Sequence, residues 1–105
     1  MDIAEEDKAA IRSIVDMQLQ NIANLVQFSE NEKVRENLGI TNSFDFIMGI
    51  VYDGMLASIN NYFLQKMKIQ QPTREQFMEI MEIATSETLT SLTDIKQEIK
   101  KQLNN

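Results

Sequence analysis

SFDFIMGIVYDGMLASINNYF, residues 43–63, is the most apolar segment of the chain and sets its architecture. Phe46, Ile50 and, just beyond the segment, Leu64 lie on one side of the predicted helix. A broader apolar face lies roughly opposite at helical spacing, and it contains Phe44, Met48, Val51, Tyr52, Met55, Ile59, Tyr62 and Phe63. A helix that is apolar on two sides is normally covered on two sides. We therefore expect this segment to be the central helix of the protein.

Two breaks bound this helix. In the first break, Gly39 suits the left-handed position just past a helix end, and Ser43 can cap the helix that follows. In the second break, the only proline, Pro72, discourages the preceding residue from remaining helical. Thr73 and Gln76 then have the spacing of a capping box. The breaks therefore predict three long helices.

The three predicted helices cover about 3–36, 44–69 and 74–103. Each begins with acidic residues and ends with basic ones, as the helix dipole prefers. Helices of this length span roughly 40–50 Å, and short connections favour antiparallel neighbours. We expect an all-α fold, a single domain over 1–105, built as an up-down-up antiparallel bundle of three helices.

The flanking helices each have one apolar stripe. In the third helix this stripe is apolar at both ends and small or hydroxylated in the middle, and it includes Phe77, Ile80, Met81, Ala84, Thr88, Ser91, Leu92, Ile95 and Ile99. The central helix has more apolar surface than two such neighbours can cover, and exposed apolar patches usually mark interfaces. We therefore expect a homodimer. The predicted interface residues are Phe46, Ile50, Leu64, Met67 and Met78.

The composition excludes several kinds of chemistry. The 105 residues include no cysteine and no histidine, which excludes thiol nucleophiles, cysteine zinc sites and histidine acid–base catalysis. Glycines occur singly, so no phosphate-binding loop is present. A net charge of −6 argues against direct binding of nucleic acid. We predict that the chain is not an enzyme and has no cofactor and no metal.

The N-terminal residues and the apolar stretches indicate where the protein is located. The first residues lack the basic start and apolar run of a secretory signal. Charged or amide side chains interrupt every apolar stretch, so no window reaches the roughly 18 apolar residues of a membrane span. We expect a cytoplasmic protein that does not enter a membrane.

A patch of small residues is the most unusual feature of the sequence. If the second and third helices are antiparallel, small side chains of one come level with those of the other. Glycine within a helix costs about 1 kcal/mol relative to alanine, so a compensating role is expected. We favour close helix packing, and the alternative is a pocket for a small apolar ligand. The patch comprises Gly49, Asp53, Gly54, Ala57, Ser58, Ala84, Thr88 and Ser91.

Acidic side chains give two further hypotheses. A buried Asp53 would require a partner or a function, whereas the favoured alternative is a narrow solvated strip formed with Asn60 and Asn61. The remaining carboxylates could bind Mg²⁺ in principle, but we favour a solvated acidic face. They include Glu30, Glu32, Glu36, Glu79, Glu82 and Glu87.

Taken together, these features predict a non-enzymatic helical module for protein–protein interaction or oligomerisation. One version is an acidic inhibitor or adaptor that acts on a partner with a basic surface, because acidic charge tunes partner choice and association rate. The alternative is a sensor or carrier of a small apolar ligand, with its pocket between the second and third predicted helices.

Overall fold

The computed structural model describes residues 3–104, which are entirely helical apart from turns and connecting segments. The helices are α1 (Glu5–Glu30), α2 (Glu32–Leu38), α3 (Ser43–Lys66), α4 (Arg74–Thr88) and α5 (Ser91–Leu103). The prediction of an all-α fold is therefore confirmed. The prediction of three uninterrupted helices is wrong, since the first and the third are each divided in two.

The first predicted helix is divided at Asn31. This residue has an extended backbone, and its side-chain oxygen accepts the backbone N–H groups of Lys33 at 3.0 Å and Val34 at 3.1 Å. Asparagine competes in this way with helical hydrogen bonding and is a preferred N-cap. The capped segment leaves α1 and continues as the short helix α2.

The third predicted helix is divided at Leu89 and Thr90. Both residues keep right-handed helical dihedral angles, but the backbone bonds from Leu89 to Ser86 and from Leu92 to Leu89 reach back only three residues and are long, at 3.4 Å. Thr88 lies at this point, and its hydroxyl donates to the Ala84 carbonyl at 2.7 Å. Back-bonding of this kind weakens and bends helices, which explains the change of direction.

Ser43 is not the cap of α3, contrary to prediction. Asn42 occupies the cap position and accepts the backbone N–H of Asp45 at 3.0 Å. The Ser43 hydroxyl instead accepts a hydrogen bond from Arg35 and donates one to Glu30 at 2.8 Å. It therefore ties the end of α1 to the start of α3.

The other predicted helix-boundary signals are confirmed. Gly39 has the left-handed backbone predicted for it, with φ of 65°. The Thr73 hydroxyl accepts the Gln76 N–H at 3.1 Å, and the Gln76 side chain accepts the Thr73 N–H at 2.9 Å.

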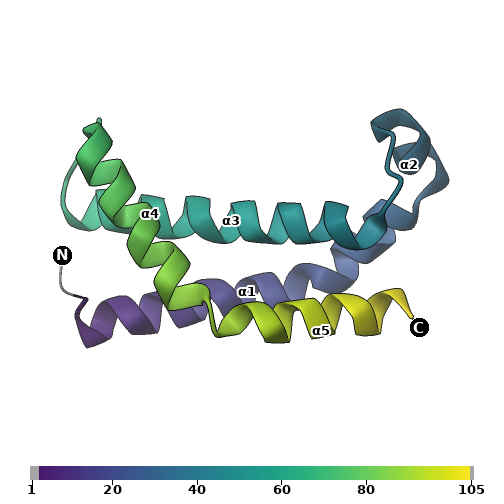
Figure 1. Ribbon diagram of the computed structural model, residues 1–105, viewed down its shortest axis with the longest axis horizontal. Helices are drawn as coiled ribbons and strands as arrows, with labels where there is room; N and C mark the ends of the chain where they lie inside the picture. The colour runs from purple at the N-terminus through teal and green to yellow at the C-terminus, as the bar shows by residue number, and fades with distance from the viewer. Residues whose placement is uncertain (1–2, 105) are drawn as a thin grey trace.

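The helices form an elongated body with principal extents of 43 × 26 × 16 Å. Figure 1 shows α1 and α3 running in opposite directions along the long axis, with α5 beside α1 and α4 crossing obliquely from one end of α3. α3 contacts α1, α4 and α5, and α1 contacts α2, α3, α4 and α5, so α3 shares the centre of the fold with α1, whereas α3 alone was expected there. The described helices include none that is long and apolar enough to cross a membrane.

The core follows one narrow line along α3. Ile47, Val51, Met55, Ile59 and Phe63 recur every four residues and are essentially inaccessible to water. Much of the broader face expected for this helix, including Phe44, Met48 and Tyr52, is only half-buried. The other core residues are Ile11, Val15 and Ile22 from α1, Ile80, Ile83 and Ala84 from α4, and Ile95 and Ile99 from α5.

Candidate functional site

The eight residues of the predicted small-residue patch lie in different environments. Ala84 and Thr88 are buried in the core. Gly54 faces α1, where a Cβ atom would lie 3.0 Å from the side-chain nitrogen of Gln18. The others are at or near the surface: Gly49, Asp53 and Ala57 are exposed, and Ser58 and Ser91 are half-buried. The structure therefore does not gather the eight residues into one pocket.

Two members of that patch, Asp53 and Ala57, line a depression between α3 and α4, which we call the α3–α4 groove. Phe77 and Met81 form its α4 wall, and the α3 wall also includes Leu56 and Asn60. The groove has a volume of about 260 Å³ and is open at the surface. The Asn60 Oδ1 atom beside it is buried without a hydrogen-bond partner.

A second depression begins where the groove ends, because both are lined by Met81. It extends along the outside of α4 past Met78 to Leu89, has a volume of about 480 Å³ and also contacts Glu82. Large apolar side chains thus line the outer side of α4 at both ends of the second depression, and the shorter polar side chains of Thr85 and Ser86 line it between Met81 and Leu89. We call Phe77, Met78 and Met81 of α4, together with Leu89 just past its end, the α4 stripe.

Three of the four residues of the α4 stripe are well exposed to water, and Met81 is half-buried. The exposed fractions are 43% for Phe77, 50% for Met78 and 63% for Leu89. On the opposite side of the same helix, Ile80 is completely buried. A surface helix normally shows polar residues on its outer side. α4 instead has a second apolar side, which the rest of the chain leaves exposed.

The charged residues that line the groove and the second depression are both acidic. Asp53 lines the groove, and Glu82 lines the depression along α4. Both side chains are exposed. This part of the molecule is therefore an apolar surface with acidic side chains at its edge.

The predicted interface residues overlap the α4 stripe at Met78. Ile50 is 37% exposed, and Phe46 is half-buried and stacks on Phe28 with ring centres 6.5 Å apart. Leu64 and Met67 are half-buried. Sequence reasoning assigned Phe77 to the inward stripe of the third helix, which is wrong. Its adjacency to Met78, with Met81 one turn further on, was the available signal for a second apolar side.

A buried polar cluster joins the start of α1 to the end of α3. The Asp7 carboxylate, only 2% exposed, accepts hydrogen bonds from Lys66 at 2.6 Å, from the Tyr62 hydroxyl at 2.7 Å and from the Ala4 N–H at 3.1 Å. Lys66 also lies 3.1 Å from Glu6. Sequence reasoning treated Asp7 only as an acidic helix start and missed this cluster.

The pKa values in this cluster shift as the contacts require. The hydrogen bond from Lys66 holds the pKa of Asp7 below its ordinary value of 3.8. The Asp7 carboxylate raises the pKa of Lys66 to about 12 and also raises that of Tyr62. Since the carboxylate is bound by a cation, a hydroxyl and an amide, the cluster is a structural tie rather than a reactive site.

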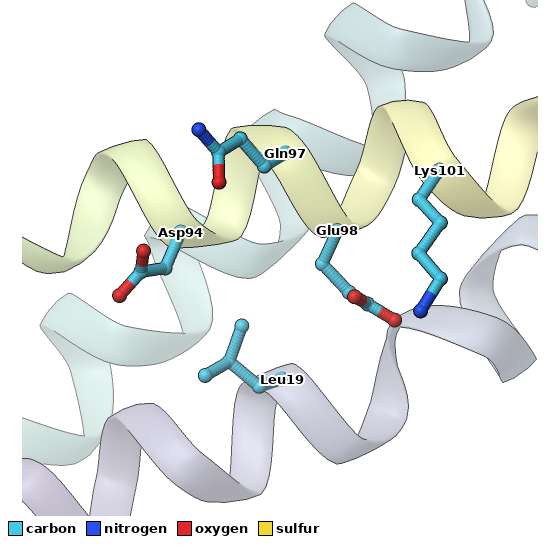
Figure 2. Close-up of a pocket in the computed structure, with 5 residues that line it drawn as sticks. All are labelled: Leu19, Asp94, Gln97, Glu98 and Lys101. Carbon is cyan, nitrogen blue, oxygen red and sulfur yellow. The ribbon is translucent and has the colours of Figure 1, made fainter.

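Another depression, of about 500 Å³, lies between α1 and α5. Figure 2 shows Leu19 of α1 opposite α5, with the side chains of Asp94, Glu98 and Lys101 extending from α5 toward α1 and that of Gln97 pointing away from Leu19. Its charges are of both signs, and Glu98 accepts a hydrogen bond from Gln102 at 2.9 Å. Within residues 3–104, no three acidic side chains gather in a way that suits a metal ion. These features make the α1–α5 depression a weaker candidate than the α4 stripe.

Comparisons of this chain with protein-family models, with curated proteins and with solved structures found no match.

Proposed function

We propose that this chain is a non-enzymatic interaction module that binds a protein partner through the α4 stripe and the α3–α4 groove. The main support is the exposure of Phe77 and Met78 on α4, and of Leu89 just past its end, because the other side of this helix already fills the core. Exposed apolar groups that adjoin one another are typical of interaction sites. Their removal from water by a partner would be favourable in proportion to the apolar area covered.

The shape of the molecule also supports this proposal. Its accessible surface is 7047 Å², whereas a compact monomer of 12.1 kDa exposes about 6,000 Å². The excess is roughly 1,000 Å², and a standard interface covers about 800 Å² on each partner. The excess is therefore of the size that a partner would cover. A second candidate function is homodimerisation, in which another copy of the chain covers the exposed apolar side chains.

The alternative of a small-molecule carrier has less support. The α3–α4 groove measures about 260 Å³ and is open, whereas small-ligand sites are usually enclosed and occupy about 300–1,000 Å³. Ala84 and Thr88, which were expected to border such a pocket, are in the core. The groove is better suited to one or two side chains of a partner protein.

The proposal can be tested with a photo-crosslinking amino acid placed at Met78 in cells that produce the protein. We expect discrete protein adducts from this position. The control is the same amino acid at Glu36, an exposed residue of α2. An adduct of twice the chain mass identifies homodimerisation, and a larger or smaller adduct identifies a different partner. Equal crosslinking from both positions, or none from either, contradicts the proposal.

A further inference from the structure

The α4 stripe has the dimensions of a short helix. It runs from Phe77 to Leu89, a distance of about 18 Å at 1.5 Å per residue. A partner helix of about three turns matches this length. The adjoining α3–α4 groove, at about 260 Å³, has room for anchoring side chains from such a helix.

The chemistry of the surface suits an apolar helix face. Met78 and Met81 lie between Phe77 and Leu89, and methionine side chains adapt to partners of irregular shape. Amphipathic helices commonly bind in grooves of this composition, with apolar anchors three or four residues apart.

Charge distinguishes between the two possible sources of that helix. α4 contains four glutamates and one arginine, a net charge of −3, and the charged residues that line the groove and the second depression are Asp53 and Glu82. A second copy would bring an equally acidic α4 to the interface, where like charges oppose association. A partner with lysine or arginine beside its apolar face would be attracted instead.

We infer that the α4 stripe and the α3–α4 groove bind a basic amphipathic helix of another protein, an inference that rests on the function proposed above. Apolar residues of the partner cover Phe77, Met78, Met81 and Leu89. Its basic residues lie toward Asp53 and Glu82.

The test uses the full chain and a fluorescent 14-residue amphipathic peptide of leucine and lysine, followed by fluorescence anisotropy. We expect saturable binding that weakens as salt rises. The paired substitution Met78→Ser with Leu89→Ser should weaken binding about tenfold or more, as removal of interface anchors does. Asp53→Asn with Glu82→Gln should weaken it several-fold. An acidic peptide of leucine and glutamate with the same pattern should not bind.

Control variants and a second measurement make the result specific. Glu32→Gln with Glu36→Gln removes the same number of charges from α2 and should leave binding unchanged. If it weakens binding as much as Asp53→Asn with Glu82→Gln, the attraction is general and the inference is wrong. The methyl NMR signals of Met78 and Met81 should shift during titration of the unmodified chain, and unshifted signals also contradict the inference.

Failure of the inference can be distinguished from failure of the proposed function. Sedimentation equilibrium of the unmodified chain and of the Met78→Ser, Leu89→Ser variant measures self-association. If the stripe supports self-association and the basic peptide does not compete with it, the inference is wrong and the interaction function stands. If peptide binding, self-association and crosslinking are all independent of the stripe, the proposed function and the further inference are both wrong.

Discussion

The two sides of α3 differ in how completely the chain covers them. On the side toward α1, which we call the closed side, the Asp7 carboxylate is bound by Lys66 and Tyr62, and Gln18 lies against Gly54. On the side that includes the α3–α4 groove and the outer surface of α4, which we call the open side, large apolar groups face water. The closed side is covered within the chain, whereas the exposed apolar groups on the open side leave water only when something else covers them.

The largest expected effect separates the two sides of α4. Ile80→Ala should lower the free energy of unfolding by about 3 kcal/mol, because Ile80 is fully buried and its truncation leaves a cavity. Met78→Ser, on the exposed side, should change it by less than about 0.5 kcal/mol. Urea denaturation of both variants measures this difference. Similar losses from the two substitutions would show that the stripe is part of the core.

The closed side should depend on its buried carboxylate. Asp7→Ala should lower the free energy of unfolding by about 2 kcal/mol, because Tyr62 and the Ala4 N–H lose their acceptor. The loss is moderated because Lys66 is partly exposed and can be solvated. Asp16→Ala, an exposed position of the same helix, is the control for thermal unfolding. A melting temperature as high as that of the control would exclude a stabilising role for the cluster.

The same cluster should make stability depend on pH in two ranges. Because folding lowers the pKa of Asp7 below 3.8, its contribution is present at neutral pH and is lost as the pH falls from about 5 through the folded-state pKa. Because folding raises the pKa of Lys66 from 10.5 to about 12, its contribution is present below pH 10.5 and is lost as the pH rises toward 12. Denaturation as a function of pH should show a flatter acid limb for Asp7→Asn than for the unmodified chain.

The smallest expected effect compares two glycines of α3. Gly49→Ala should raise the free energy of unfolding by about 0.8 kcal/mol, because alanine is the better helix former and no atom beyond the adjoining helix backbone and chain neighbours lies within 4 Å of the added Cβ. Gly54→Ala should give less, since its Cβ requires the flexible end of Gln18 to move. Denaturant titration of both variants measures the difference. A larger gain at Gly54 would contradict the assignment of Gly54 to the closed side of α3.

Local signals predicted much of the fold. The helix expected over 44–69 is observed as Ser43–Lys66, with Gly39 before it and the Thr73–Gln76 capping box after it. These elements depend on hydrogen bonds between near neighbours in the chain. The division at Leu89 was missed because the backbone stays helical there and the apolar period continues through it.

The residues of the candidate site were harder to predict from the sequence. Met78 was expected at an interface, but Phe77 and Met81 were assigned to the inward stripe of one long helix. Which side of a helix is covered depends on where its neighbours cross it, and the bend at Leu89 changes that crossing. Asp7 was missed for a similar reason, since Tyr62 and Lys66 lie far from it in sequence.

The sequence by itself determined an acidic, all-helical chain and the extent of α3, because helical periodicity, caps and charge are properties of neighbouring residues. The tertiary structure alone decided which apolar side chains remain in water. That outcome depends on the oblique crossing of α4, which buries Ile80 and leaves Phe77, Met78 and Leu89 exposed.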